Sequence, residues 1–357
     1  MINKLIYVFI YVAFAFLVLY RAKFMGLKGN QFNEDCFSLD ACRSIKGICA
    51  VVVIMHHLSL HFYNDRIMLP FMQSGKYAVS VFFFFTGFGL MKSFLSKPNY
   101  FKHFISTRLS KVLIPSIVAG IVYCIVESIG LTEKNISIMK LVLGKELIIP
   151  YSWFVYQIVL VYVAFYFIFK YIRNIKVGVI IFFTLTVIDV LLFAVLGYEL
   201  FWSIGIVCVV LGVLFAYKFD EILKLVKKKY YLLTAFCSAL FAFLFVLMSA
   251  YFQDIENKNS LDIALELIIT NATCILFCLL LVLVIMKFRI GNRATDFFGK
   301  ISFELYLYQG LAFEFLFQST SIPNPVVWML SFALCVSISV LANASTNRVF
   351  GLMKRQR

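Results

Sequence analysis

The sequence predicts an all-α, polytopic integral membrane protein of about eleven transmembrane helices, with the N-terminus outside and the C-terminus inside the cell. Hydrophobic residues make up 62% of the 357 residues and charged residues only 14%, whereas soluble domains carry about 25% charged residues. The mean hydropathy of +0.93 agrees with a chain that lies largely in a bilayer. The lengths of the apolar runs and the placement of Lys and Arg then give the number of spans and their direction.

Apolar runs of about 20 residues can cross a hydrocarbon core of about 30 Å as helices, and the sequence contains eleven such runs. They cover residues 4–20, 46–63, 77–95, 112–130, 151–169, 177–197, 200–217, 230–252, 263–286, 300–317 and 326–347. Arg21 and Lys23 directly follow the first run, which has no A-x-A-like cleavage site. We therefore expect the first run to be a helix and not a cleaved signal peptide.

Lys and Arg collect in the cytoplasmic loops of membrane proteins. With the N-terminus outside, the segments expected inside hold 26 of the 33 basic residues, and those expected outside hold seven. Shifting the count by one span would reverse this asymmetry. The formal net charge of +15 is therefore expected to face the cytoplasm and its anionic lipid. A nucleic-acid partner is not expected, because the sequence contains no soluble domain that could carry a basic face.

The nine cysteines predict neither disulfides nor a metal site. Seven lie in the expected spans, and Cys36 and Cys42 lie in an expected cytoplasmic loop, where thiols stay reduced. Their spacing does not match that of zinc ligands. We expect them to pack as small apolar side chains.

The second expected span carries two adjacent histidines, whose imidazoles need hydrogen-bond partners that lipid does not supply. His57 follows Lys46 by eleven residues, which is about 16 Å along a helix and within roughly 20° of the same direction. One helix face is thus expected to place a cation at the cytoplasmic mouth and an imidazole near mid-bilayer. His57 is a candidate general base. Hydrogen bonding to a neighbouring helix is the alternative, and it is the favoured interpretation for His56.

Several segments, in this order, resemble the acyltransferase 3 family of integral membrane acyltransferases. They are KGICAVVVIMHH (46–57), VSVFFFFTGFGL (79–90), TRLSKVLIP (107–115), YSWFVYQIVLVY (151–162) and FFGKISFELYLYQ (297–309). The family pattern begins with a basic residue, ten intervening residues and a histidine, which matches Lys46 and His57, although most members have arginine first. Gln309 stands where many members have a histidine, so a role for that histidine is not carried over.

The resemblance covers about residues 39–348 and ten of the expected spans. It implies a membrane-embedded domain at 39–357, preceded by an additional N-terminal helix and loop at 1–38. It also implies transfer of an acyl group, most often acetyl, from cytoplasmic acyl-CoA to a hydroxyl of a carbohydrate or lipid-linked saccharide, in a bacterial plasma membrane. The partners implied are acyl-CoA, the saccharide acceptor and the lipid bilayer, and no metal is expected.

The same resemblance implies roles for four residues near or within the expected spans. His57 and Lys46 are the catalytic candidates, and His57 would deprotonate the acceptor or relay the acyl group. Lys46, Arg108 and Lys111 would lie near the cytoplasmic face, where they could meet the CoA phosphates and the entry of the pantetheine arm, because cations suit phosphate recognition. Membrane anchoring by positive charge is the alternative for this pair.

Further candidates for substrate contacts come from the other segments. Thr86 replaces a serine of the family's aromatic-rich segment, and Trp153 lies in its Trp-Phe span. Glu304 lies about one turn inside the tenth span, where a carboxylate is a functional candidate by default. Packing between helices is the alternative for Glu304, as it is for the polar residues Gln157 and Asn271.

Two other functions remain possible from the sequence. A transporter or flippase of a saccharide or its lipid carrier is one, and paired inverted repeats with broken helices would favour it. The sequence shows no clear pair. A non-catalytic member of a polysaccharide-assembly complex is the other, and the Lys46/His57 pair argues against it. Acyl-CoA turnover by the purified protein separates the acyltransferase from both.

Single cysteines introduced into a background without native cysteines should report the topology. A cysteine in the 318–325 loop should react with an impermeant thiol reagent added outside, whereas one in the 218–229 loop should not, because the second loop belongs to the basic side. Labelling of intact cells measures both, with lysed cells as the positive control. The opposite pattern would overturn the orientation and the cytoplasmic placement of Lys46.

Overall fold

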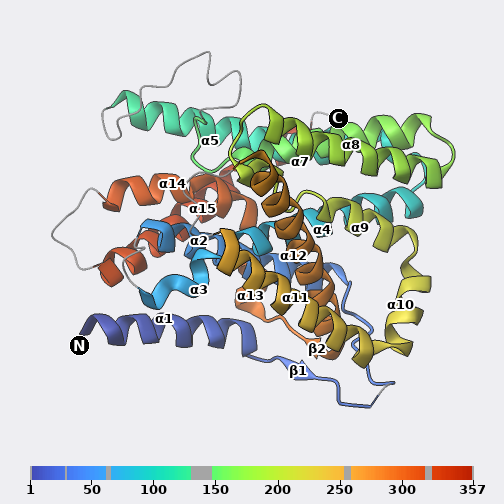
Figure 1. Cartoon of the computed structure of the whole chain (residues 1–357). Helices are drawn as coiled ribbons and strands as arrows, with labels where there is room; N and C mark the ends of the chain where they lie inside the picture. Colours follow the sequence, from blue (N-terminus) through green and yellow to red (C-terminus); the bar gives the residue numbers. More distant parts are fainter. Residues whose placement is uncertain are drawn as a thin grey trace.

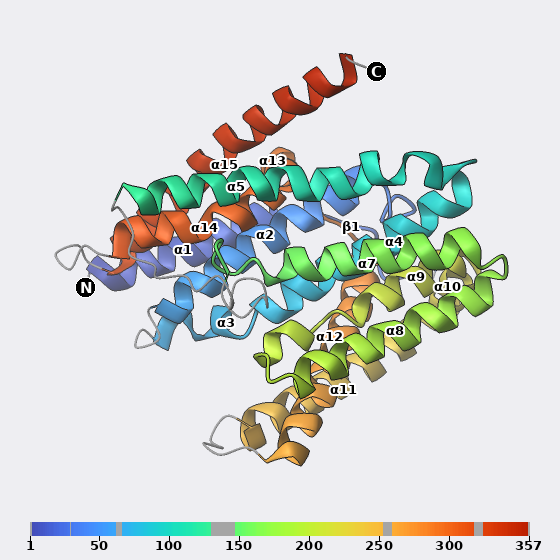
Figure 2. The ribbon, with the colours of Figure 1, turned by 90° about the horizontal axis from the view of Figure 1, so that it is seen from above.

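Helices running mostly along one direction make up the molecule (Figures 1 and 2). The computed structural model describes residues 2–28, 30–61, 66–129, 147–252, 259–317 and 324–355. Within these residues the only strands are the two-residue β1 (Lys23–Phe24) and β2 (Phe288–Arg289), which pair antiparallel. Helices satisfy their own backbone hydrogen bonds, as a bilayer requires.

Nine helices in the described part of the chain are long and apolar enough to cross a membrane. They are α2 (Leu39–His61), α4 (Gly75–Ser96), α5 (Ser110–Ser128) with the preceding η3 (Ile105–Leu109), α7 (Trp153–Tyr171), α8 (Ile175–Val195), α9 (Cys208–Tyr217) with η4 (Leu200–Ser203), α11 (Tyr230–Phe252), α12 (Ser260–Lys287) and α15 (Asn324–Arg355). Two shorter apolar helices, α1 (Ile2–Leu19) and α14 (Ser302–Phe317), overlap the first and tenth expected spans. An all-α polytopic membrane protein is therefore confirmed, whereas the number of eleven spans stays a prediction.

Short helices connect these long ones. They are η1 (Arg66–Met68) and α3 (Leu69–Met72) before α4, η2 (Tyr100–His103) before η3, α10 (Phe219–Lys228) after α9, and α13 (Arg293–Lys300) before α14.

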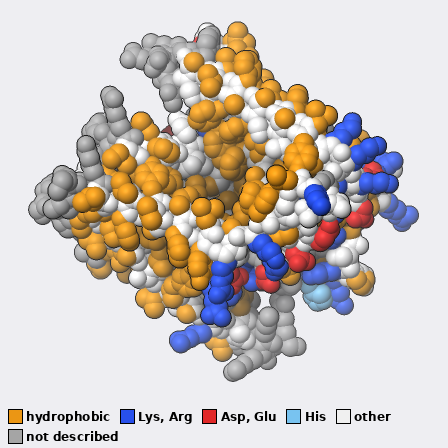
Figure 3. All heavy atoms as spheres, turned by 90° about the horizontal axis from the view of Figure 1, so that it is seen from below, with side chains coloured by type: hydrophobic (Ala, Val, Ile, Leu, Met, Phe, Trp, Pro, Cys, Tyr) orange, Lys and Arg blue, Asp and Glu red, His pale blue; other side chains and the backbone are white. Residues whose placement is uncertain are grey.

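Contacts between connecting segments bring together three of the loops expected inside, those at 21–45, 218–229 and 287–299. β1 pairs with β2, and Lys227 of α10 forms an ion pair with Glu34 at 2.8 Å. On the face in Figure 3, hydrophobic side chains cover the left part, and Lys and Arg gather on the right and along the lower edge. The right is the side on which Figure 1 shows α10. These contacts agree with the expected placement of those loops, and the orientation of the bundle in the membrane stays a prediction that rests on charge.

α2 begins at Leu39, seven residues before the expected start of the second span at residue 46. The Ser38 hydroxyl accepts a hydrogen bond from the Ala41 amide at 3.2 Å, and such bonds favour helix initiation. The first turns of α2 pack closely on α13, because a Cβ at Gly47 would collide with the backbone of that helix. Lys46 therefore lies within a helix and has a fixed direction.

α4 lies in the interior, in contact with α2, α9 and α12. The side chains of Phe83, Phe84 and Phe85 are all buried, as expected for a helix that is apolar on every side. Gly87 of α4 and Gly212 of α9 allow these two backbones to approach, since a Cβ at either position would meet the backbone of the other helix. Small residues serve the same purpose in other membrane helix pairs.

Gln157 and Asn271 support the short 3-10 helix η4 and the irregular backbone that follows it. The Gln157 amide donates to the carbonyl of Trp202 at 2.9 Å. The Asn271 side chain donates to the carbonyl of Ser203 at 3.1 Å and accepts from the amide of Gly205 at 3.0 Å. Backbone groups outside helices need such partners at membrane depth. Gln157 and Asn271 therefore have the structural role, packing between helices, that was the alternative for them.

Lys287 ties the N-terminal loop to the end of α12. Its side chain is 3% exposed, and the ammonium donates to the carbonyls of Gly26, Lys28 and Gln31 at 3.1, 2.8 and 2.7 Å. α1 also packs on α15. The expected division into 1–38 and 39–357 stays a prediction, with the two parts packed together.

Candidate active site

Two neighbouring cavities share α2 and α4 as walls. The first, the basic cavity, has a volume of about 410 Å³, and its polar lining includes Lys46, Thr86, Arg108, Lys111, Lys300, Glu304 and Gln309. The second, the histidine cavity, has a volume of about 500 Å³ and is lined among others by His56, His57, Lys76, Tyr151, Trp153 and Glu199. Val53, Val79 and Tyr306 line both cavities. Single side chains therefore separate the two spaces.

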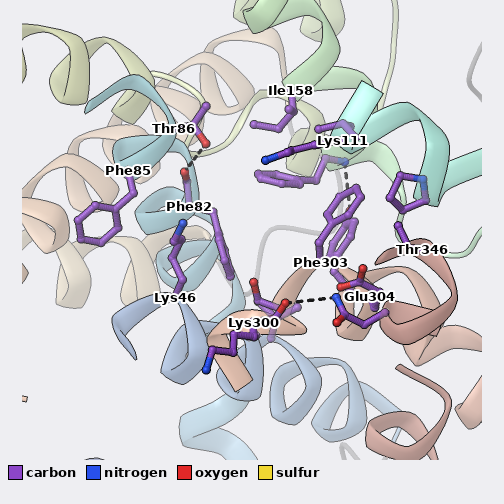
Figure 4. Close-up of a pocket in the computed structure, with 18 of the residues that line it drawn as sticks. Lys46, Phe82, Phe85, Thr86, Lys111, Ile158, Lys300, Phe303, Glu304 and Thr346 are labelled. Carbon is purple, nitrogen blue, oxygen red and sulfur yellow. Dashed lines mark hydrogen bonds between the residues drawn. The ribbon is translucent and has the colours of Figure 1, made fainter. Parts of the chain in front are cut away.

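Four cations from four helices line the basic cavity, and two of them lack a protein partner. Lys46 and Lys111 make no hydrogen bond or ion pair with any residue that the structure describes. Arg108 donates to the hydroxyl of Ser93 at 2.8 Å, and this bond leaves most of its guanidinium free. Figure 4 shows Lys46, Lys111 and Lys300 around the cavity with Glu304, on separate helices. The arrangement suits a ligand that carries several negative charges.

Arg108 and Lys111 lie where the helix geometry changes. η3 is a π-helix of five residues that leads directly into α5. Pro115 lies inside α5 and lines the basic cavity. A proline has no N–H and crowds the preceding turn, and π turns in helices occur frequently at functional sites. The helix pitch therefore changes at the point where Arg108 and Lys111 both line the basic cavity.

An ion-pair network holds the helices at the mouth of the basic cavity. Asp296 of α13 forms an ion pair with Lys300 at 2.6 Å and with Arg43 of α2 at 2.9 Å. The hydrogen bond from Lys300 lowers the pKa of the Asp296 carboxyl, and the bond from Arg43 adds to this effect. Asn292 caps the start of α13 by accepting from the amides of residues 294 and 295 at 2.9 and 3.0 Å. Asp296 therefore stays ionised and positions Lys300.

His57 of α2 has its tautomer set by α14. Its side chain is buried, at 9% exposure, and Nδ1 lies 2.9 Å from Oε1 of Gln309. The Gln309 amide nitrogen donates to the carbonyl of Tyr306 at 3.1 Å, which directs the amide oxygen toward His57. An amide oxygen only accepts, so Nδ1 carries the hydrogen and Nε2 keeps its lone pair. The imidazole is thereby arranged to accept a proton at Nε2.

Tyr151 stacks on His57 and has a strained backbone. The two rings lie 4.0 Å apart between centroids at an interplanar angle of 23°. Tyr151 has φ of 66°, in the left-handed region that costs a residue with a side chain of this size. The Tyr306 hydroxyl donates to the carbonyl of Tyr151, and the Tyr151 hydroxyl lies 3.1 Å from Nε2 of His61. Such strain is typical of functional sites.

His56 is hydrogen bonded in a different way. Its Nδ1 lies 3.1 Å from the carbonyl of Phe71 in α3, and its ring packs against Gly75, where any Cβ would collide with it. His56 thus bonds to a neighbouring segment, as its favoured interpretation expected. Its ring also lines the histidine cavity, 5.0 Å between centroids from that of His57.

The model of the acyltransferase 3 family, described as an acyltransferase domain, matches residues 40–344. The chain belongs to the acyltransferase 3 family. The match covers most of the chain, and the protein is accordingly a membrane acyltransferase. No curated protein and no solved structure is significantly similar to this chain.

The predicted site residues of this acyltransferase 3 protein divide between the two cavities. The basic cavity contains Lys46, Thr86, Arg108, Lys111 and Glu304, and the histidine cavity contains His57 and Trp153. The face of α2 expected to carry both Lys46 and His57 lines the two cavities in succession. The roles assigned to these residues stay predictions.

The three further candidates have different surroundings. Thr86 donates its hydroxyl to the carbonyl of Phe82 at 2.8 Å, so only its oxygen lone pairs remain for a ligand. Glu304 is 5% exposed and lies close to Asn343 of α15. Trp153 packs on Phe201, with ring centroids 5.7 Å apart. Glu304 therefore lines the basic cavity from a buried position next to α15.

Sequence reasoning missed three residues of this site. Gln309 was set aside because it replaces a histidine of the family, yet it is the hydrogen-bond partner of His57. Tyr151 gave no signal, because its position depends on a backbone turn. Lys300 was counted only as an inside charge, although it lines the basic cavity. The 100° periodicity of the tenth span places Gln309 about 140° from Glu304 around the helix, and it does not show which of the two residues meets α2.

Asp296→Asn should reduce stability in a pH-dependent way. Because folding lowers the pKa of Asp296, its contribution is present above the unfolded carboxyl pKa of about 3.9 and is lost as the pH falls through the lower folded value. A partly exposed network of this kind is worth at most about 1 kcal/mol. Apparent Tm of both proteins at about pH 7 and pH 3 measures the difference, which should shrink at the lower pH.

Glu221→Gln is the matched control, because Glu221 of α10 forms an exposed ion pair at 2.6 Å with Lys218, the residue directly before that helix. It should not change the packing of α2 on α13. An Asp296→Asn difference that is the same at both pH values would show that charge on Asp296 does not hold these helices.

Proposed function

We propose that this membrane acyltransferase moves an acyl group, which its family resemblance indicates to be acetyl, from cytoplasmic acyl-CoA to a hydroxyl of a cell-surface or lipid-linked saccharide. The protein would act in the plasma membrane of a bacterium. The observation that carries the proposal is that His57, which lines the histidine cavity, is held in one tautomer by Gln309, which lines the neighbouring basic cavity.

The basic cavity is the proposed donor site. CoA carries phosphate groups, and Lys46, Lys111 and Arg108 offer donors that the described protein leaves largely unused. These cations lie on helices whose ends belong to the side expected to be cytoplasmic, where acyl-CoA is available. The apolar lining, which includes Phe82, Phe154 and Ile158, suits the less polar pantetheine arm.

The proposed chemistry uses Nε2 of His57 as a general base. The acceptor hydroxyl oxygen bonds to the carbonyl carbon of the thioester while its proton passes to Nε2. The carbon–sulfur bond then breaks, and the CoA thiolate takes the proton from the imidazolium. Nδ1 keeps its hydrogen bond to Gln309 throughout, so the ring orientation does not change.

The histidine cavity is the proposed acceptor site. It is lined by the C-terminal part of α2 and the N-terminal parts of α4 and α7, which are the ends expected outside. Aromatic side chains such as Trp153 and Tyr151 suit the faces of a sugar ring, and polar groups suit its hydroxyls. Donor and acceptor would thus approach His57 from different ends of the bundle.

Turnover of acyl-CoA by the purified full-length protein is the direct test. Release of free CoA thiol, measured with a thiol reagent in lipid nanodiscs, should depend on the protein and on His57. A protein that moves saccharide across liposomes without consuming acyl-CoA would establish a transporter instead.

His57→Ala should abolish transfer, because removal of a general base typically costs about 10²–10⁴-fold in rate. His56→Ala is the matched control and should keep much of the activity, since His56 bonds to the Phe71 carbonyl and not to Gln309. The measurement is kcat for both variants at saturating acyl-CoA. An inactive His56→Ala with an active His57→Ala would reassign the base, and two fully active variants would exclude histidine catalysis.

Replacing Arg108 and Lys111 together with alanine should weaken acyl-CoA binding in a protein that still folds and inserts. Each charge-assisted contact is worth about 1.5–3 kcal/mol, so the pair should cost roughly 100-fold or more in donor affinity. Lys97 and Lys102 are the control pair, because neither lines the basic cavity. If both double variants have the same KM for acyl-CoA, Arg108 and Lys111 do not bind the donor, and membrane anchoring is the role that remains for them.

A further inference from the structure

Lys76 places a half-buried cation in the wall of the histidine cavity. It is the second residue of α4, and its ammonium donates to Oε1 of Gln73 at 3.1 Å and contacts the sulfur of Met248 at 3.3 Å. Within the described residues it makes no ion pair with a carboxylate. The ammonium also lies 5.4 Å from the centroid of the Tyr77 ring. An amide oxygen, a thioether and an aromatic ring supply no full negative charge to balance the ammonium.

The surroundings of Lys76 increase the positive potential of the cavity wall. The N-terminal end of α4 carries the positive end of the helix dipole, where a lysine is unfavourable and an anion is favoured. Glu266 of α12 is near enough to act on the charge of Lys76 without forming an ion pair with it. Glu199, the carboxylate in the cavity lining, is exposed. The cavity therefore contains a cation with unused capacity to donate hydrogen bonds.

Membrane anchoring does not account for this lysine. Only seven of the 33 basic residues are expected on the outer side, and anchoring charges collect on the other side. Of those seven, Lys76 is the one whose side chain the structure describes, and this side chain faces a cavity. This position leaves the ammonium accessible to a ligand in the cavity.

We propose that Lys76 binds an anionic group of the acceptor, a phosphate or a carboxylate, and so directs an acceptor hydroxyl to His57. The proposal rests on the proposed acyl transfer and names the chemical class of its acceptor. The path between the two residues is short, because Gly75 contacts the His56 ring, and the His56 and His57 rings lie 5.0 Å apart between centroids.

A neutral saccharide would leave the Lys76 ammonium without a counter-charge, whereas an acidic one supplies a charge-assisted hydrogen bond. Such a bond corresponds to an affinity difference of about 10- to 100-fold. Lys76 is on this view a specificity-determining residue, and the base remains His57.

Direct binding to the full-length protein in nanodiscs of neutral lipid tests the proposal without the donor. Three probes are compared: a neutral oligosaccharide, the same oligosaccharide with a uronate carboxylate, and the same oligosaccharide with a phosphate monoester. The wild-type protein should bind at least one acidic probe about 10- to 100-fold more tightly than the neutral one. The better acidic probe identifies the source of the negative charge.

Lys76→Gln should remove the preference for the acidic probe and leave the weak binding of the neutral probe unchanged. Lys76→Arg should keep most of the preference for the acidic probe, because a cation remains at the same place. Lys92→Gln is the matched control. Lys92 lies on the same helix at its other end, with its ammonium 4.6 Å from the centroid of the Phe219 ring, and its loss should not change the preference.

Equal binding of neutral and acidic probes by the wild-type protein would overturn the proposal, even where Lys76→Gln fails to fold. A preference that survives in a folded Lys76→Gln variant would overturn it as well. Failure of acyl transfer itself is seen separately, as a lack of CoA release by the wild-type protein. Binding and turnover therefore report on the acceptor subsite and on the proposed function independently.

Discussion

The hydrogen bond between Nδ1 of His57 and Oε1 of Gln309 is the contact on which the arrangement of this site depends. It joins α2 to α14, residues 252 positions apart in sequence, and it leaves Nε2 as the basic nitrogen. This bond requires α14 to keep a fixed position along the axis of α2. α13 fixes that position, because it directly precedes α14 and packs on the first turns of α2 through Gly47 and Gly299. The ion pairs of Asp296 hold the same helices together from the side.

Charge divides the molecule into two functional halves around this bond. The end expected inside carries most of the Lys and Arg, and four of these cations line the basic cavity. The rule that orients membrane proteins thus also concentrates positive charge where a phosphate-bearing donor would enter. Among the residues that line the histidine cavity, Lys76 is the single Lys or Arg, and it makes no ion pair with a carboxylate among the described residues. A difference in the number of cations can distinguish a highly charged donor from an acceptor with one anionic group.

The sequence was sufficient for those features that depend on helical periodicity and on apolar length. All eleven apolar runs overlap helices, and the eleven-residue spacing of Lys46 and His57 placed both on the face of α2 that lines the cavities. It was insufficient for contacts between distant helices, such as Gln309 with His57. The start of α2 was also not predicted from the sequence. The first turns of α2 are polar, as a loop would be, and they are helical because they pack on α13. The position of the Tyr151 side chain depends on a left-handed backbone conformation, which a periodic sequence pattern does not predict.

Irregular backbone at membrane depth is concentrated around the two cavities, and each instance has its own polar support. Tyr306 donates to the carbonyl of Tyr151, and Gln157 and Asn271 donate to the carbonyls of η4, which contributes Phe201 to the histidine cavity. Each unsatisfied carbonyl in a bilayer would cost several kcal/mol, so these side chains make the irregular walls possible. A bundle of uninterrupted apolar helices would be easier to form. It would present neither a stacked tyrosine nor a polar cavity to His57.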